Sequence, residues 1–175
     1  FANMTRFSWM LRDLSTLLCV GIALAPAFKM RFWNVGAEGQ MLVGGIATAF
    51  WMINFAGKMN IVMLFLCMAI SAIVAGGIWG LIPGCFKAKW NTNETLFTLM
   101  MNYIATQIVA YFCYKWSNPK GSGHIGVINS VSHNGWLPSL GGQDYLLNIL
   151  IVAALTVFMY IYLKYSKHGY ESSAV

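Results

Sequence analysis

The chain alternates between long apolar runs and short polar breaks. A helix rises 1.5 Å per residue, so a run of about 20 apolar residues crosses the roughly 30 Å hydrocarbon core of a bilayer. Five runs reach or approach this length, and they cover residues 14–30, 40–56, 61–86, 95–114 and 144–163. Residues 1–13, before the first run, mix aromatic with charged side chains, which is typical of a short interfacial segment. The pattern predicts an all-α, polytopic membrane bundle of about five transmembrane helices.

The break between the first two runs is unusually rich in polar groups and glycine. Residues 32–40 read Phe-Trp-Asn-Val-Gly-Ala-Glu-Gly-Gln. Irregular backbone at membrane depth is tolerated only where protein or a water-filled cavity surrounds it. Two short runs on either side of such an insert are typical of a discontinuous or re-entrant arrangement. We therefore expect a discontinuous segment near residues 31–40.

Composition supports a membrane protein and argues against several other classes. The chain is 58% hydrophobic and 9% charged, whereas soluble domains carry about 25% charged residues. The net charge of +6 comes from basic residues at the ends of the apolar runs, without a basic and aromatic cluster. We therefore expect membrane lipid as the surroundings and no nucleic-acid partner. The four cysteines lie singly in apolar runs, so neither a disulfide framework nor a metal site is predicted.

The basic residues also suggest an orientation. With five spans, residues 29–31, 87–94 and 164–175 share one side and carry six Lys and Arg residues, against five on the other side. The positive-inside rule then makes the first side cytoplasmic. We expect one transmembrane domain over 1–175, an extracytoplasmic loop at 115–143 and a cytoplasmic tail at 164–175.

A stripe of small residues lies along the third run. Its members are spaced four apart and share one helical face: Ala72, Gly76, Gly80 and Gly84. Small side chains let a second helix approach closely, and lipid provides no hydrophobic force that would do so. Glycine is also simply frequent in membrane helices, but four residues in register favour a packing face.

Polar residues near the fourth run have two kinds of explanation. Asn91 and Glu94 have the spacing of a capping box, and Glu94 suits the positive end of a helix dipole. Asn102 lies inside the run, where an amide is costly unless a neighbouring helix or a ligand pairs with it. It is a candidate for either role.

Glu38 is the acidic residue that lies away from the run ends. Inserting a carboxylate at the bilayer centre costs roughly 2.5–3.5 kcal/mol on insertion scales. One interpretation is structural: Glu38 pairs with Lys29 or Arg31, or caps the helix that opens at Gln40. The other is functional: Asn34, Glu38 and Gln40 line a translocation path or its gate. The sequence leaves both open.

No catalytic site is visible. The chain lacks the nucleophile-elbow, zinc-protease, phosphate-loop and dinucleotide-binding motifs, and its five acidic residues are scattered. We therefore expect no enzyme and no cofactor. A transporter built on this chain needs energy from a partner or from an ion gradient.

Two motifs resemble a known family. Residues 34–40, Asn-Val-Gly-Ala-Glu-Gly-Gln, are similar to the N-I-G-A-E-G-Q signature of bacterial ABC-transporter permeases of the nucleoside type, within the branched-chain amino acid and ribose permease family. Residues 87–95 and 101–105, preceded by Pro83-Gly84, resemble that family's K-A-x-F-x-x-N-E and M-L-N-Y-I-A segments. The tail 169–175 resembles its G-Y-E-L-R-A-V-G segment, although Ser173 stands where the family has an arginine.

The resemblance implies the central half of a permease in a bacterial inner membrane. It implies ABC ATPase subunits, a second permease subunit and an extracytoplasmic substrate-binding lipoprotein as partners, and nucleosides or pentose-type sugars as cargo. Six polar residues match motif positions. Four are expected along the substrate pathway (Asn34, Glu38, Gln40 and Asn102), and two as a cap or gate (Asn93 and Glu94).

The alternative is a stand-alone channel or ion-coupled transporter for a small polar solute. It predicts transport in liposomes without ATP, whereas the permease interpretation predicts none. A membrane-embedded enzyme is disfavoured by the scattered acidic residues.

Overall fold

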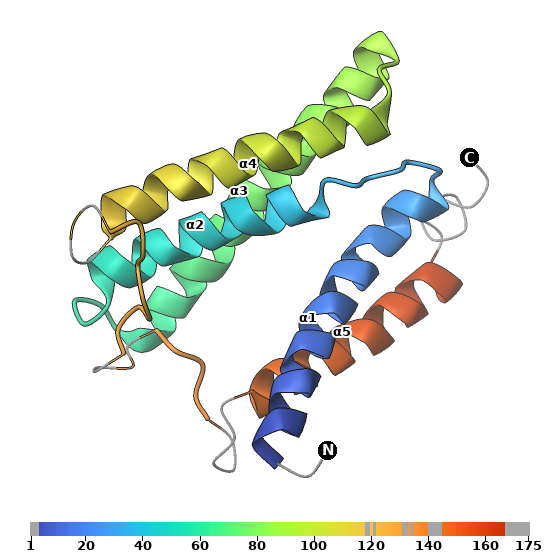
Figure 1. Cartoon of the computed structure of the whole chain (residues 1–175). Coiled ribbons are helices and arrows are strands. Elements are labelled where there is room, and N and C mark those ends of the chain that lie inside the picture. Colours follow the sequence, from blue (N-terminus) through green and yellow to red (C-terminus); the bar gives the residue numbers. More distant parts are fainter. Residues whose placement is uncertain are drawn as a thin grey trace. The chain divides into compact units, whose positions relative to one another are not determined.

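The chain folds into α-helices, as the apolar runs predict. The computed structural model describes residues 4–117, 120, 122–130, 133, 135–139 and 145–166, with only the backbone for residues 4 and 5. The described residues form five helices and no strand (Figure 1). In chain order these are α1 (Met4–Lys29), α2 (Ala37–Phe55), α3 (Ile61–Trp90), α4 (Glu94–Trp116) and α5 (Leu146–Tyr165). The prediction of an all-α membrane bundle is confirmed.

Four of the described helices are long and apolar enough to cross a membrane, and α2 is not one of them. The four are α1 from Arg6 onward, α3, α4 and α5. The 19 residues of α2 pack against both α3 and α4. A helix that is covered by two others needs less apolar surface toward lipid, so its weak hydropathy follows from its place in the bundle.

Several predicted boundaries are wrong. Helix α1 starts at Met4, so residues 4–13 continue the first span and are not a separate segment. The break covers residues 30–36, and α2 starts at Ala37. The expected start at Gln40 is therefore three residues late, and residues 37–40 are the first turn of a helix. Glycine and glutamate made this turn look irregular, but tertiary contacts hold it helical.

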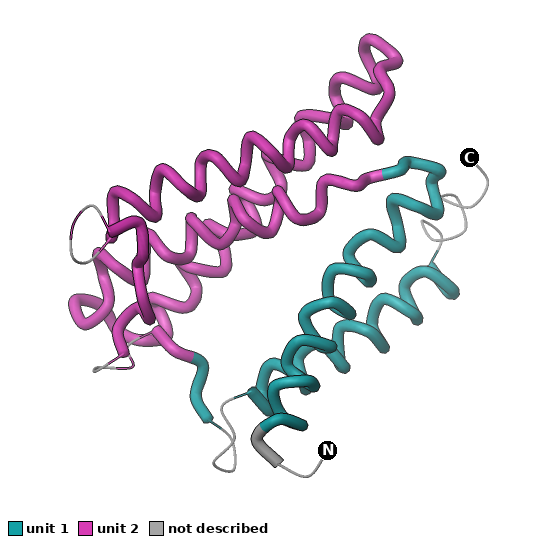
Figure 2. The backbone as a smooth tube through the Cα atoms, in the orientation of Figure 1, with its two compact units in different colours: residues 1–33, 137–175 teal, residues 34–136 magenta. Residues whose placement is uncertain are grey.

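The described residues divide into two compact units (Figure 2). Unit 1 contains residues 1–33 and 137–175, and its helices α1 and α5 pack on each other. The Asn148 amide donates to Ser15 Oγ at 3.2 Å, and Lys29 Nζ donates to the Leu163 carbonyl at 3.0 Å. Since Ser15 precedes Lys29 in α1 and their partners Asn148 and Leu163 follow the same order in α5, the two helices run parallel. Unit 2 contains residues 34–136, with α2, α3 and α4.

Three members of the small-residue stripe face α2 in unit 2. A Cβ added at Gly44 would lie 3.4 Å from the Ala72 carbonyl oxygen. One added at Gly76 would lie 3.3 Å from the Gln40 carbonyl oxygen, and one at Gly80 would lie 2.9 Å from Gln40 Nε2. At the fourth stripe position, residue 84, a Cβ would meet nothing within 4 Å. The close approach of α2 and α3 therefore extends over residues 72–80 of the stripe.

The turn between α3 and α4 corrects the predicted capping box. Asn91 is the left-handed C-cap of α3, with φ 50°, and its N–H donates to the Lys87 carbonyl at 2.9 Å. Asn93 is the N-cap of α4, and its Oδ1 accepts from the Leu96 N–H at 3.2 Å. Asparagine adopts the left-handed conformation more readily than most residues, so Asn91 ends one helix and Asn93 begins the next. Glu94 pairs with Lys87 at 2.9 Å.

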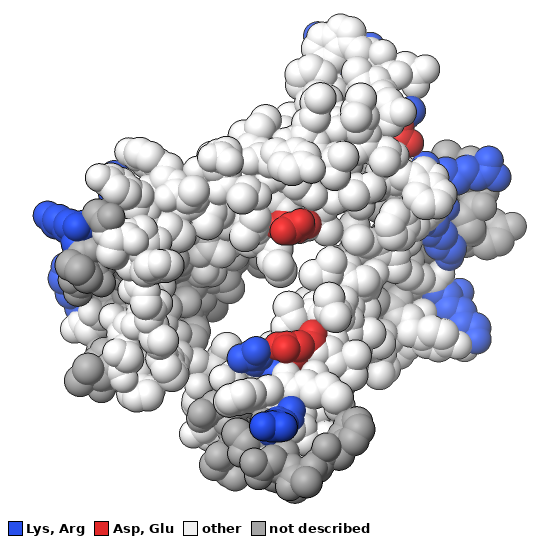
Figure 3. All heavy atoms as spheres, in the orientation of Figure 1, with Lys and Arg blue, Asp and Glu red and all other residues white. Residues whose placement is uncertain are grey.

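The surface of the described residues suits lipid. Large apolar side chains are widely exposed, with Ile73 73% and Leu17 71% accessible. The view in Figure 3 is mostly free of charged groups. In water such a surface would aggregate. With four membrane-length helices, the chain is a multi-pass membrane protein.

Candidate functional site

The break before α2 begins with a local turn at Asn34. This residue is buried, with 9% of its surface accessible, and its Oδ1 accepts a hydrogen bond from the Gly36 N–H at 2.9 Å. A short amide that bonds the backbone two residues on replaces a backbone turn. The Gly36 carbonyl then accepts the Gln40 N–H at 3.1 Å, which is the first bond of α2. Asn34 thus sets the direction in which the helix starts.

Asn102 of α4 holds both sides of this start. Its Oδ1 accepts from the Gly39 N–H at 2.9 Å, and its Nδ2 donates to the Val35 carbonyl at 2.9 Å. The N-cap residue Gly36 has no side chain that could accept from the first turn. The Asn102 amide, 63 residues away in the sequence, therefore accepts the hydrogen bond from the first turn of α2 that an N-cap side chain would normally accept. The pairing answers why an asparagine is tolerated inside this span.

Thr98 completes the arrangement from one turn earlier on α4. It is fully buried, its Oγ1 accepts from the Val35 N–H at 3.2 Å, and the same hydroxyl donates to the Glu94 carbonyl at 2.8 Å. Asn34, Thr98 and Asn102 together are called the clamp below. Between them they bond the N–H or carbonyl of Val35, Gly36 and Gly39. Such backbone groups are costly to leave unpaired away from water.

The two motif glycines are needed for close approach and not for an unusual φ. A Cβ added at Gly36 would lie 3.0 Å from Thr98 Cβ. One added at Gly39 would lie 2.7 Å from Asn102 Oδ1 and 3.2 Å from Trp79 Nε1. The clamp therefore requires glycine at both positions, because any side chain would push α4 or α3 away.

The clamp lies well inside the bundle. Asn102 is eight residues after Glu94, the first residue of α4, which is about 12 Å along the helix axis. Helix α2 thus starts about two helical turns farther along the axis of α4 than the first residue of α4. The non-helical backbone of the break is covered there by α4, as membrane depth requires.

Thr98 was not foreseen from the sequence. A threonine in an apolar helix usually bonds its own preceding turn, and Thr98 does this as well. Its position four residues before Asn102 places both on one face of α4. That spacing was the available signal.

Glu38 has a different environment from its neighbours. It lies in the first turn of α2, where the helix dipole favours a carboxylate. Its side chain is exposed, and the expected pairing with Lys29 or Arg31 is not among the ion pairs of the described residues. Helix α2 starts at Ala37, so Glu38 is its second residue and not the cap of a helix that opens at Gln40.

The remaining candidates are distributed around unit 2. Gln40 is half-buried, and its amide packs over Gly80 of α3. Asn93 and Glu94 form the α3–α4 turn described above. The structure therefore brings Asn34 and Asn102 together at the clamp, with Gln40 on the α3 side of the same helix start. Nowhere in the described ranges do three metal-ligating side chains gather.

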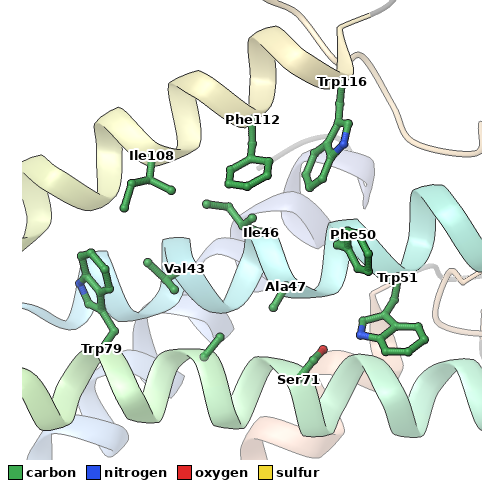
Figure 4. Close-up of a pocket in the computed structure, with 11 residues that line it drawn as sticks. Val43, Ile46, Ala47, Phe50, Trp51, Ser71, Trp79, Ile108, Phe112 and Trp116 are labelled. Carbon is green, nitrogen blue, oxygen red and sulfur yellow. The ribbon is translucent and has the colours of Figure 1, made fainter.

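A cavity of about 360 Å³ lies farther along the same three helices (Figure 4). Its walls are almost wholly apolar, and five aromatic rings contribute to them. The aromatic members are Phe50, Trp51, Trp79, Phe112 and Trp116. The buried Trp79 Nε1 has no hydrogen-bond partner among the described residues, and it lies beside the Gly39 backbone. The indole therefore separates the cavity from the clamp.

Comparisons of the sequence with a family model and with known proteins agree on one family. Residues 7–175 match the family described as the permease component of branched-chain amino acid transport systems. A guanosine ABC transporter permease protein of Bacillus subtilis is 32% identical over 168 residues, covering 94% of this chain and 47% of that protein. No solved structure matches the chain significantly.

Two further relatives differ in the cargo that their names give. A glucose ABC transporter permease protein of Haloferax volcanii is 28% identical, covering 91% of this chain and 44% of that protein. A nucleoside ABC transporter permease protein of Lactococcus lactis is 27% identical, covering 94% and 47%. The chain spans about half the length of these relatives.

Proposed function

The chain belongs to the permease-component family of branched-chain amino acid transport systems, and on that premise we propose that it forms part of the membrane-spanning permease of an ABC importer for nucleosides. The observation that carries this proposal is the 32% identity with a guanosine ABC transporter permease protein over 94% of the chain. The nucleoside permease relative supports the same cargo, and the glucose permease relative keeps sugars as the second candidate.

The importer we propose draws its energy from other subunits. The sequence has no phosphate-binding loop, so ABC ATPase subunits would hydrolyse the ATP. A second permease subunit would complete the pathway, and an extracytoplasmic substrate-binding lipoprotein would deliver cargo. We place the assembly in a bacterial inner membrane, with the loop at 115–143 outside and the tail at 164–175 in the cytoplasm.

Within this permease, we assign two roles to the predicted pathway residues. Asn34 and Asn102 shape the pathway, because their side chains already bond the backbone that starts α2. Gln40 supports the same turn from its contact with Gly80. Asn93 and Glu94 fix the turn before α4, and we assign this turn to the gate. Glu38 faces the pathway itself.

The free-energy cost of exposing a carboxylate to lipid supports this role for Glu38. An exposed carboxylate cannot be left against lipid tails, so it needs water, a cation or a second protein. The clamp holds the turn that carries it about two helical turns inside the bundle. A water-filled translocation path would satisfy the carboxylate, and hydroxyl groups of a nucleoside could donate to it.

The function is tested by uptake of labelled guanosine in cells that lack their own nucleoside importers. We expect uptake when the full-length permease is expressed with its neighbouring transporter genes, and none when the ATPase is inactivated. Uptake of glucose in place of guanosine would show that the cargo is a sugar. Transport by the permease alone in ATP-free liposomes would contradict the importer and favour the channel.

Glu38→Gln tests the pathway assignment. We expect guanosine uptake to fall about tenfold or more, which corresponds to a lost interaction of about 1.4 kcal/mol, with membrane insertion and ATPase copurification unchanged. Asp13→Asn is the matched control, since Asp13 is also exposed but pairs with the adjacent Arg12 at 2.7 Å. Normal uptake by the Glu38 variant would remove Glu38 from the pathway.

A further inference from the structure

The aromatic cavity of unit 2 offers almost nothing to a polar ligand. It lies between α2, α3 and α4, and from Val43 to Trp51 it follows α2 for about 12 Å. Apart from the indoles, its lining contains one polar side chain, Ser71, whose hydroxyl donates to the Met68 carbonyl of its own helix at 3.0 Å. Figure 4 shows the Phe112 and Trp116 rings of α4 above Ile46 and Phe50 of α2.

A second cavity continues the first across α2 and α4. Its volume is about 210 Å³, and it shares Ile46, Phe112 and Trp116 with the larger cavity. Its other lining residues are also mostly apolar, among them Met41, Leu42 and Val109. The two cavities therefore adjoin at these shared residues, with α3 contributing to the walls of the larger one.

This chemistry disfavours the proposed cargo as the occupant. A nucleoside carries hydroxyls and ring nitrogens, and burying a polar group without a hydrogen bond costs roughly 1–3 kcal/mol in proteins. Specific sites place a few polar groups to orient such a ligand. Here the walls provide none that is free to do so apart from indole N–H groups. The occupant that fits is a hydrocarbon chain.

The charges around this end of unit 2 are all positive. Lys58 follows α2, Lys115 lies in the last turn of α4, and Lys120 follows it; all three are exposed. The acidic residues of unit 2, Glu38 and Glu94, lie in the first turns of α2 and α4, at the opposite end. Because α2 and α4 run parallel, the lysines and the aromatic cavity share one end. Figure 3 shows blue atoms gathered there, at the left of the view.

We propose that this end of unit 2 binds an anionic phospholipid, with one acyl chain in the aromatic cavity and the phosphate at the lysines. Tryptophan is favoured at the membrane interface, where Trp51 and Trp116 would flank the glycerol region. The positive charge of the three lysines attracts the negative charge of an acidic headgroup. The site is separate from the clamp and from the cargo pathway.

Native mass spectrometry of the full-length protein in detergent tests the site. The probes are phosphatidylglycerol and phosphatidylcholine with identical acyl chains. We expect the first retained lipid to be phosphatidylglycerol, bound at least tenfold more tightly. Ala47→Trp fills the cavity and should remove lipid of both kinds, whereas Ile73→Trp, at a position 73% exposed on α3, should leave binding unchanged.

Neutralising the lysines gives an independent test that does not alter the cavity. Lys58→Gln, Lys115→Gln and Lys120→Gln combined should abolish the preference for phosphatidylglycerol, while Lys89→Gln at the other end should not. Equal binding of the two lipids by the unaltered protein would overturn the proposal. So would an unchanged lipid complement in Ala47→Trp accompanied by loss of a protein subunit, because a polypeptide segment would then fill the cavity.

Discussion

The two ends of unit 2 are built in opposite ways from the same three helices. At the start of α2 the contacts are polar and leave no space: Asn102 bonds both Val35 and Gly39, and a Cβ at Gly39 would lie 2.7 Å from the Asn102 amide oxygen. At its end, aromatic rings surround an apolar cavity of about 360 Å³. One end is fixed by directional bonds, and the other has room for a ligand.

This difference predicts where substitutions should matter. Hydrogen bonds to buried backbone have one geometry, so a small displacement breaks them. Apolar contacts are non-directional and can adjust. The clamp end is therefore expected to tolerate little change, and the cavity end to tolerate more. Three substitutions test this contrast, in order of expected effect.

Gly39→Ala is expected to be the most damaging small change. The added Cβ would lie 2.7 Å from Asn102 Oδ1 and 3.2 Å from Trp79 Nε1, so α2 must move. Overpacking of this kind costs about 1–3 kcal/mol, to which the lost clamp bonds add. We expect a lower melting temperature of the purified protein and loss of uptake.

Gly45→Ala is its control on the same helix. A Cβ there meets nothing within 4 Å, so the higher helix propensity of alanine should make the change neutral or stabilising by up to about 1 kcal/mol. Equal melting temperatures for the two alanine variants would show that the clamp end is not tightly packed.

Asn102→Ala removes the two hydrogen bonds by which the Asn102 amide holds the start of α2. The Gly39 N–H and the Val35 carbonyl then lose their partners, at roughly 1–3 kcal/mol for each group left buried. We expect reduced thermal stability and faster hydrogen exchange at Gly39. Asn54→Ala is the control, since the Asn54 amide is exposed and bonds the Phe50 carbonyl of its own helix. Unchanged exchange at Gly39 would contradict the proposed capping from α4.

Thr98→Val should have the smallest effect of the three. It keeps the shape and removes the bond to the Val35 N–H, which costs about 1–2 kcal/mol. Thr98→Ser keeps the hydroxyl and should restore most of the stability. Ser71→Ala is the matched loss of a hydroxyl at the cavity end, where the bond stays within one helix. If Ser71→Ala destabilises as much as Thr98→Val, the contrast between the two ends fails.

The long helices were readable from the sequence because lipid imposes a simple rule. A segment that faces hydrocarbon must be apolar over its whole length. The structure accordingly starts α3 at the predicted Ile61 and places α4 and α5 within a few residues of their predicted bounds. The glycine spacing on α3 was likewise visible, since a four-residue repeat needs only helical geometry.

The end of the break was misplaced because it depends on a partner distant in the sequence. Glycine and glutamate after Gly36 suggested irregular backbone, but Asn102, 63 residues later, holds the turn helical. One interpretation paired Glu38 with a nearby cation, but Glu38 is exposed and belongs to none of the ion pairs of the described residues. The cap at Asn91 was misplaced for a local reason: Asn91 is left-handed and ends α3, and Asn93 is the N-cap of α4.

An all-helical membrane protein with a polar break before its second helix follows from the sequence alone, because apolar length and motif letters are local properties. Three features follow only from the packed helices: the break ends at Gly36, Thr98 and Asn102 hold it, and an aromatic cavity lies beyond Trp79. The physical reason is that hydropathy is a property of each residue, whereas a hydrogen bond between α4 and the start of α2 exists only once both are packed together.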